Sequence, residues 1–413
     1  MKILFVDDEP YILRSIQRLL MRRPYEALYA ESGKKALSIL ETTSVDAVVS
    51  DMMMPEMNGY DLLQKIKELY PSTARIILSG FADAKIIQNA VMQGIATAYL
   101  LKPLEIEVLV SILKQCQTMR DHLNDARVRN AILSAGPLPV LSKRRQDLLA
   151  LVEADSSADD IVGAVELDSA VSTNILRLAN SAFYGHKASV GSIKDAIVFM
   201  GVGAVKGIVW ALSIIDEKIL GQDATLRLRR LQDTSAQVNR LTNALYYKLN
   251  GRLIPDAARS IGLVHDMGMY LMEIRMPEQM KQMAQTLVQG SEPALSPSDR
   301  EKNVFGAGHD EIGGYLLDLW SFPRICVAAA LYHHHPVQEH LSIEEQRILS
   351  ILHLVDRYAW KRYGDHDLIT EFEEDAAALG IIGQSRGEMN AMIEEIETVG
   401  QANKPGDSED VTP

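Results

Sequence analysis

Five polar side chains in the first quarter of the chain follow or end short apolar runs, namely Asp7, Asp8, Asp51, Ser79 and Lys102. Three crowded carboxylates repel one another and need a cation, and oxygen-only ligation with room for water suits Mg²⁺. A carboxylate can also be the nucleophile in phosphoryl transfer, which gives an acyl phosphate. A metal and a lysine would neutralise the charge on the phosphoryl oxygens, and a small hydroxyl would donate a hydrogen bond to one of them.

The segments around these residues predict five strands that alternate with five helices over residues 1–120. Strands are expected at residues 2–6, 25–29, 46–50, 75–79 and 98–101. Helices are expected at residues 10–22, 34–41, 58–69 and 83–93, and from residue 104 onward. The fold class is therefore α/β, a doubly wound parallel five-stranded sheet covered on both faces. Ligands of such sheets gather at the carboxyl ends of the strands, so the five polar residues should meet at one edge.

Four motifs resemble those of response-regulator receiver domains, which have a flavodoxin-like fold. They are Phe5-Val6-Asp7-Asp8-Glu9, the ten residues from Ser50 to Gly59, Leu78-Ser79-Gly80 and Leu101-Lys102-Pro103. The resemblance covers about residues 1–120. It implies that Asp51 is the phosphoacceptor and that Asp7 and Asp8 hold Mg²⁺, with the backbone carbonyl of Met53 as a further ligand. The implied phosphodonor is a sensor histidine kinase or a phosphotransfer protein.

The same resemblance implies roles for the residues of the last two strands. Ser79 and Lys102 would contact the phosphoryl group, Tyr99 occupies the aromatic switch position, and the bond before Pro103 would be cis. The alternative is that these residues have only structural roles. The acids would then be solvated strand ends and helix caps, and Tyr99 a strand tyrosine that packs its ring.

Length, charge and composition exclude several classes of protein. The chain has 413 residues, a formal net charge of −13 and 47% hydrophobic residues, so two or three folded domains are expected. The acidic balance and the lack of a basic recognition helix argue against nucleic-acid binding. Two distant cysteines fit a reducing compartment, and no apolar run approaches a membrane span. Met1 leads directly into a strand pattern, so we expect no signal peptide, no membrane association and a cytoplasmic location.

Beyond residue 120 the pattern becomes helical. The last receiver helix is expected to continue as one connecting helix over residues 104–135, whose coiled-coil packing could form a homodimer. A Gly- and Pro-containing cluster at residues 135–139 marks a boundary. We expect an all-helical domain over residues 136–400 and a disordered tail at residues 401–413.

Motifs in this second region resemble an HDOD domain, a regulatory relative of the HD phosphohydrolases, over about residues 136–360. They include Leu138-Pro139-Val140-Leu141, the segments 176–185, 196–201 and 262–268, Glu301 to His309, Trp320 to Pro323, His333-His334-His335-Pro336 and residues 352–356. The segment 176–185, which ends in Asn-Ser-Ala-Phe-Tyr-Gly, is the most specific of them.

Six residues of this domain could form a second site, namely His265, Asp266, His309, His334, His335 and Asp356. Mixed His and Asp ligation suits a transition metal that activates water for phosphoester cleavage. HD hydrolases also need a histidine on an earlier helix, and the residue at the best match for that position is Thr234. Threonine is a poor substitute for an imidazole ligand, so the ligand set is incomplete. A downstream protein partner is therefore the expected output, and phosphoryl acceptance with autohydrolysis at Asp51 the only covalent chemistry. The alternative is a metal-dependent phosphohydrolase or cyclic-dinucleotide phosphodiesterase. His265 and Asp266 could also be a purely structural pair.

Overall fold

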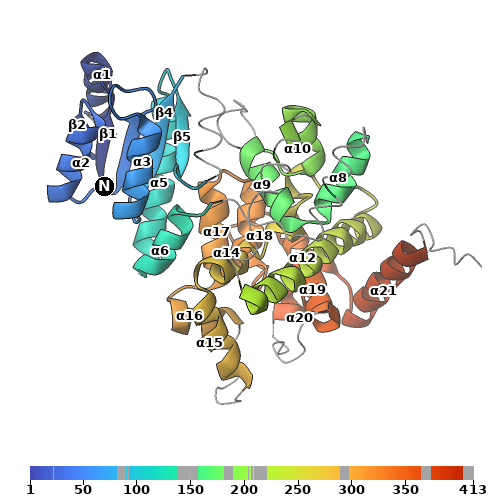
Figure 1. Cartoon of the computed structure of the whole chain (residues 1–413). Helices are drawn as coiled ribbons and strands as arrows, with labels where there is room; N and C mark the ends of the chain where they lie inside the picture. Colours follow the sequence, from blue (N-terminus) through green and yellow to red (C-terminus); the bar gives the residue numbers. More distant parts are fainter. Residues whose placement is uncertain are drawn as a thin grey trace, which may run out of the picture.

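The N-terminal region is a parallel sheet of five strands in the order β2-β1-β3-β4-β5 (Figure 1). This computed structural model describes residues 1–21, 23–80, 90, 93–123, 125–136, 148, 157–180, 189–202, 204–205, 208, 221–288, 297–363 and 374–402. The strands are β1 Lys2–Val6, β2 Glu26–Ala30, β3 Ala47–Asp51, β4 Ala74–Ser79 and β5 Ala98–Leu101. The doubly wound order confirms the predicted α/β class, with the first strand inside the sheet and all carboxyl ends at one edge.

Helices cover both faces of the sheet, and the sequence specifies where several of them begin. They are α1 Pro10–Leu20, α2 Gly33–Thr42, α3 Gly59–Leu69 and α5 Ile106–His122. The hydroxyl of Ser32 accepts a hydrogen bond from the backbone of Lys35, and Asn58 caps α3 in the same way through Asp61. These caps satisfy amides that the first helical turn leaves without partners. The helix expected at residues 83–93 lies almost entirely outside the described residues.

The expected continuous helix over residues 104–135 is wrong, because the structure has two helices there. After α5 the backbone of Leu123 becomes extended, and α6 begins at Ala126 and ends at Leu133. Asp125 caps α6 by accepting a hydrogen bond from the backbone N–H of Arg127 (2.7 Å). A capping carboxylate offers the backbone an alternative to helix continuation, which explains the break.

The regular secondary structure of the remaining described residues is helical, as the sequence predicts. The helices are α8 Ala158–Glu166, α9 Ser169–Ala179, α10 Ile193–Met200, α12 Gly221–Asn250, η4 Asp256–Ala258, α13 Ile261–Val264, α14 Met267–Arg275, α15 Pro277–Val288, α16 Pro297–Phe305, α17 His309–Leu319, α18 Arg324–Tyr332, α19 Ile343–Tyr363, α20 Glu374–Ile382 and α21 Arg386–Ala402. Within the described ranges, no helix has the length and apolarity that crossing a membrane requires. The motif residues 138–141 and 181–185 lie outside those ranges. The expected disordered tail at residues 401–413 begins too early, because α21 continues to Ala402, and its residues from 403 onward lie outside the described ranges.

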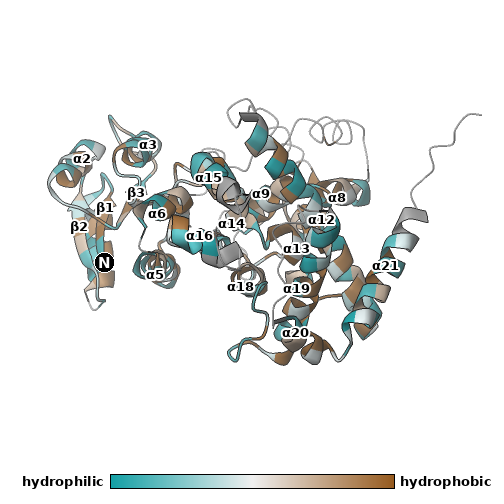
Figure 2. Ribbon diagram, turned by 90° about the horizontal axis from the view of Figure 1, so that it is seen from below, coloured by the Kyte–Doolittle hydropathy of each residue, from teal (hydrophilic) through white to brown (hydrophobic). Residues whose placement is uncertain are grey.

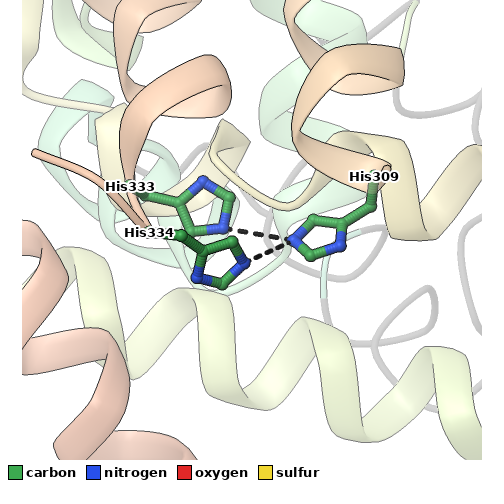
Figure 3. A group of neighbouring side chains, drawn as sticks. All are labelled: His309, His333 and His334. Carbon is green, nitrogen blue, oxygen red and sulfur yellow. Dashed lines mark hydrogen bonds between the residues drawn. The ribbon is translucent and has the colours of Figure 1, made fainter. Parts of the chain in front are cut away.

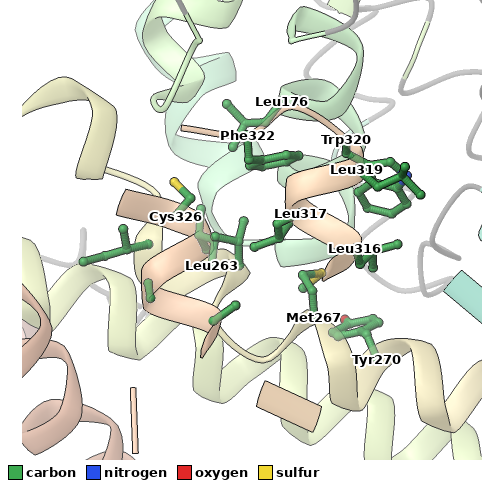
Figure 4. Packing of buried hydrophobic residues seen from close by; sticks show 14 of the residues in the cluster. Leu176, Leu263, Met267, Tyr270, Leu316, Leu317, Leu319, Trp320, Phe322 and Cys326 are labelled. Carbon is green, nitrogen blue, oxygen red and sulfur yellow. The ribbon is translucent and has the colours of Figure 1, made fainter. Parts of the chain in front are cut away.

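Close contacts between helices build the core of the helical region. Leu263, Met267, Leu317 and Phe322 pack together in Figure 4, and each is buried. Gly268 on α14 brings that helix against α17, since a Cβ at this position would lie 1.8 Å from the carbonyl oxygen of His309. The backbones at this crossing therefore leave no room for a side chain.

Helices α5 and α6 lie between the sheet and the helical region, and they contact α14 and α17 (Figures 1 and 2). One buried apolar cluster runs from the sheet face through α5 and α6 into the helical core. Polar contacts accompany it: Gln115 donates a hydrogen bond to Asp318 (3.4 Å), and the rings of His122 and Tyr315 stack with centroids 6.2 Å apart. The two halves of the molecule therefore share one core.

Three arginines hold the segment 133–136, which follows α6. Arg75 of β4, Arg177 of α9 and Arg275 of α14 donate hydrogen bonds to its backbone carbonyls at distances from 2.5 to 3.3 Å. Burial lowers the pKa of Arg75 to about 10 and that of Arg177 to about 9. Arg177 also lies over the ring of Trp320, with Cζ 4.1 Å from the centroid. The segment is thus fixed from both halves of the chain.

We expect Gly268→Ala to lower the free energy of unfolding by about 1–3 kcal/mol, because the added methyl group forces α14 and α17 apart. Gly163→Ala is the matched control. It lies on an exposed face of α8 where a Cβ meets nothing within 4 Å, and alanine's helix propensity should stabilise it by up to about 1 kcal/mol. Urea unfolding followed by circular dichroism measures both. Equal stability of the two variants would contradict the close approach.

Candidate functional site

Lys102 lies between two buried carboxylates at the carboxyl edge of the sheet. Its Nζ is 3.0 Å from Oδ2 of Asp7 and 2.5 Å from Oδ1 of Asp51. Asp7 is 1% exposed and Asp51 7% exposed, so neither charge is screened by bulk water. Parallel pairing of β1 with β3, β3 with β4 and β4 with β5 brings these strand ends side by side. Residues almost a hundred positions apart therefore form one polar centre.

Burial and charge act in opposite directions on this centre. Burial raises the pKa of Asp51, while the hydrogen bond and charge of Lys102 lower it in part, so the net direction is upward. Burial alone would lower the pKa of Lys102, but its two carboxylate partners raise it above the usual range. One ammonium group thus faces two buried carboxylates. That excess of oxygen donors fits a hard divalent cation such as Mg²⁺.

Backbone amides fix both carboxylates. Met53 N–H donates to Oδ2 of Asp51 (2.9 Å), and Glu9 N–H donates to Oδ1 of Asp7 (2.9 Å). Gly59 at the start of α3 lies directly against Asp51, since a Cβ there would be 2.1 Å from the carbonyl oxygen of Asp51. Asp8 is half-buried beside Asp7.

The other predicted receiver residues lie on β4 and β5. Ser79 is buried, and its carbonyl accepts a hydrogen bond from the backbone N–H of Lys102 (2.8 Å). Tyr99 is buried in the apolar cluster on one face of the sheet. The peptide bond between Lys102 and Pro103 is cis, as the resemblance implies.

A second polar centre lies inside the helical region. The Nε2 atom of His309 is 2.9 Å from Nε2 of His334 and 3.2 Å from Nε2 of His333 (Figure 3). All three rings offer a nitrogen within 4.8 Å of the others, which is a spacing that could hold a metal ion. His309 begins α17, and the other two rings follow α18.

An adjoining group extends this centre. The Nε2 atom of His265 is 3.1 Å from Asp356 and 3.2 Å from Oδ2 of Asp266. The other oxygen of Asp266, Oδ1, lies 3.4 Å from His333 and 3.7 Å from His309. Asp266 therefore joins the two groups into one cluster of six side chains.

The expectation that His335 belongs to this cluster is wrong. His333 lies in the cluster instead. His335 is exposed, whereas His333 is fully buried and its Nδ1–H donates to the carbonyls of Ala329 and Ala330. Helix α18 ends at Tyr332, and His333 is its C-cap with helical backbone angles, whereas His335 lies beyond the end of the helix. Locating the end of this helix to within one residue would have been necessary to predict this.

Glu301 is a further member that the sequence did not single out. Its Oε2 is 2.6 Å from Nδ1 of His309 and also accepts the backbone N–H of that residue. Burial opposes the charge on His309, but Glu301 and nearby acids raise its pKa to about 9. Burial and the neighbouring His333 and His309 lower the pKa of His334 well below its usual value. A proton on Nε2 of His309 can therefore be shared with the neutral ring of His334.

The position expected for an additional histidine ligand belongs to Thr234. It is buried on α12, which packs against α13 and α19. His265 directly follows α13, and Asp356 lies on α19. Residues 231–249 contain no histidine. A set of imidazole and carboxylate donors without this position still fits a transition metal.

Two families match this chain in separate regions. Residues 3–114 match the family described as response regulator receiver domain, and residues 138–336 match the HDOD domain family. Transcriptional regulatory protein GlrR of Escherichia coli (strain K12) is 32% identical over 136 residues, which are 33% of this chain and 30% of that protein. Two-component response regulator ARR10 of Arabidopsis thaliana is 38% identical over 114 residues, which are 27% of this chain and 20% of that protein. The chain thus spans less than a third of the length of these relatives.

Solved structures resemble the chain in part. The MmoQ response regulator from Methylococcus capsulatus str. Bath is 20% identical, covers 63% of this chain and 98% of its own, and has a TM-score of 0.49. An HDOD domain protein of unknown function from Geobacter sulfurreducens is 18% identical, covers 71% of this chain and 96% of its own, and has a TM-score of 0.37.

Replacing Lys102 with methionine should lower the free energy of unfolding at neutral pH by about 1–3 kcal/mol, because two buried carboxylates then lack their cation. A buried carboxyl with a raised pKa opposes folding while it is ionised, and this penalty disappears as the pH falls through that pKa. The deficit of Lys102→Met should therefore shrink at mildly acidic pH. Urea titrations at several pH values, with exposed Lys65→Met as control, measure it. A deficit independent of pH would contradict the assignment.

Proposed function

We propose that this chain, a two-component response regulator that joins a receiver domain to an HDOD domain, accepts a phosphoryl group on Asp51 and answers through a protein partner of its helical domain. The observation that carries the proposal is the position of Lys102 between the buried carboxylates of Asp7 and Asp51. The proposed phosphodonor is a sensor histidine kinase or a phosphotransfer protein.

The chemistry follows from the carboxylate and its cation. An oxygen of Asp51 attacks phosphorus, the new O–P bond forms, and the bond to the donor's imidazole nitrogen breaks. Lys102 neutralises charge on the phosphoryl oxygens, and Ser79 donates a hydrogen bond to one of them. Mg²⁺, when bound by Asp7, Asp8, Asp51 and the Met53 carbonyl, supplies further charge neutralisation. Water attack on the acyl phosphate slowly returns the free carboxylate.

The signal would travel along β4. Phosphorylation adds charge beside Ser79 at the end of this strand and draws Ser79, Lys102 and Tyr99 toward it. Arg75 lies on the same strand and donates to the carbonyl of Leu133. A shift of β4 therefore reaches the segment 133–136 and the arginines of the helical domain. Phosphorylation can shift the equilibrium only by making contacts that differ between two arrangements.

A test of the phosphoacceptor compares the wild-type chain with Asp51→Asn. We expect acetyl phosphate with Mg²⁺ to label the wild type and not the variant, because an amide is a poor nucleophile. Intact-protein mass spectrometry measures the added phosphoryl group. Asp46→Asn, which alters another acid of the same domain, is the control and should be labelled. Equal labelling of Asp51→Asn and wild type would overturn the assignment.

The output is tested by binding. Beryllofluoride-treated full-length chain should capture a protein that the untreated chain and Asp51→Asn do not. Equal capture of the protein by the treated chain, the untreated chain and Asp51→Asn would contradict control of partner binding by the receiver domain. Light scattering of the beryllofluoride-treated and the untreated chain tests the predicted homodimer.

A second candidate function is metal-dependent phosphoester hydrolysis under receiver control. The observation that favours it is the convergence of His265, Asp266, His309, His333, His334 and Asp356. The metal, when bound, would activate water. It would displace the proton shared between His309 and His334, and Glu301 would keep the ring of His309 oriented.

Neighbouring histidines supply a matched test of this candidate. We expect His333→Gln to lose most bound Mn²⁺ or Zn²⁺, because its ring lies in the cluster, and His335→Gln to retain it, because that ring is exposed. Metal analysis after gel filtration, with circular dichroism to verify folding, measures the difference. Equal metal content in both variants would exclude the cluster. Hydrolysis of a generic phosphodiester that is lost only in His333→Gln would favour the hydrolase over the interaction output.

A further inference from the structure

We infer that a groove between α19, α20 and α21 binds a small organic phosphate of about nucleotide size. Its volume is about 480 Å³, within the range of small-molecule sites. Figure 1 shows α19 and α20 together, with α21 to their right at the C-terminal end of the described chain. They lie beyond residue 336, so neither matched family region includes the groove.

Positive charge gathers on the walls of this groove. Four cations line it, namely Arg357, Lys361, Arg362 and Arg386, together with the two acids Asp375 and Glu394. A third acid, Glu397, lies 3.5 Å from Nε of Arg362, so four cations face three carboxylates. The surplus stands out because the whole chain carries a formal charge of −13. Guanidinium groups recognise phosphate oxygens through paired N–H donors, and a nearby ammonium group adds a point charge. The surplus of one positive charge and the exposed ammonium group of Lys361 favour an anion.

Most of the other lining residues are apolar, and Asn390 is the exception. Leu354, Leu379, Met389 and Ile393 lie along the groove, and the ring of Tyr358 adds aromatic surface. Figure 2 shows hydrophilic and hydrophobic residues mixed along α21, which supplies one wall. An inorganic anion would leave this apolar surface without a partner. A phosphate ester with a flat organic body covers both kinds of surface.

A buried carboxylate fixes two of the guanidinium groups. Asp375 lies 3.1 Å from Nε of Arg357 and 2.5 Å from Nη2 of Arg386. Burial opposes the charge on Asp375, but His353 and the two arginines hold its pKa below the usual range. Arginines held in place lose less side-chain entropy on binding a ligand, which makes the groove a prepared site.

The same carboxylate links the groove to the histidine cluster. Nε2 of His353 lies 2.9 Å from Asp375, and its Nδ1 lies 2.7 Å from the carbonyl oxygen of His333. His353 is buried between them. A ligand that binds Arg357 or Arg386 therefore contacts one end of a chain of polar contacts whose other end is the second polar centre.

Isothermal titration of the full-length chain with AMP and GMP, in EDTA to remove metal from the histidine cluster, tests the inference. We expect saturable binding of the nucleotides, weaker binding of inorganic phosphate and no binding of adenosine. Lys361→Glu should weaken nucleotide binding at least about tenfold, because it replaces attraction with repulsion beside the phosphate. Lys281→Glu, on an exposed face of α15, is the matched control and should bind as the wild type does.

Several results would overturn the inference. They are the absence of saturable nucleotide binding, equal affinity in Lys361→Glu and Lys281→Glu, or equal affinity for malonate, an anion without phosphate. Lys361 is exposed, so its variant should fold, and circular dichroism verifies this. Hydrogen exchange provides a second readout. AMP should slow exchange in α19 and α21, and protection confined to other helices would place the ligand elsewhere.

Discussion

The arrangement of the two halves of the chain depends on hydrogen-bond acceptors for buried guanidinium groups. Arg75 and Arg177 are almost completely buried, and a buried charge without hydrogen bonds is costly. The carbonyls at the end of α6 have no partners within that helix, so they need donors. The segment 133–136 satisfies both requirements at once. Because one arginine belongs to the sheet and the other to the helical domain, neither half can shift against the segment without breaking these hydrogen bonds.

This constraint connects the carboxyl edge of the sheet physically to the helical region. Ser79 and Arg75 are four residues apart on β4, so one strand touches both the proposed phosphorylation site and the segment 133–136. Gly94 adds to the coupling, since a Cβ there would lie 2.8 Å from the carbonyl oxygen of Ala135. Close backbone packing of this kind transmits small displacements, because packed interiors have little free volume.

The sequence predicted the receiver edge well for a topological reason. In a parallel sheet the end of each strand is a fixed place, so locating Asp51 and Lys102 in the sequence also locates them in space. The helical domain offers no such rule. His333 is the C-cap of α18 and His335 lies two residues beyond it, and Glu301 reaches His309 through packing of α16 on α17. The break at Asp125 did have a local signal, a capping residue, which the apolar spacing around it concealed.

The roles of Arg75 and Arg177 could not be predicted from the sequence. Their acceptors are backbone carbonyls, which every residue type has, so no sequence motif marks them. The same holds for the position of the two polar centres relative to each other. Both centres nevertheless follow one physical rule. In the receiver a single ammonium group balances two buried carboxylates, and in the helical domain Glu301 and Asp266 balance the charge on His309. Each centre therefore holds a positively charged group among buried acids, which offsets the cost of burying those acids.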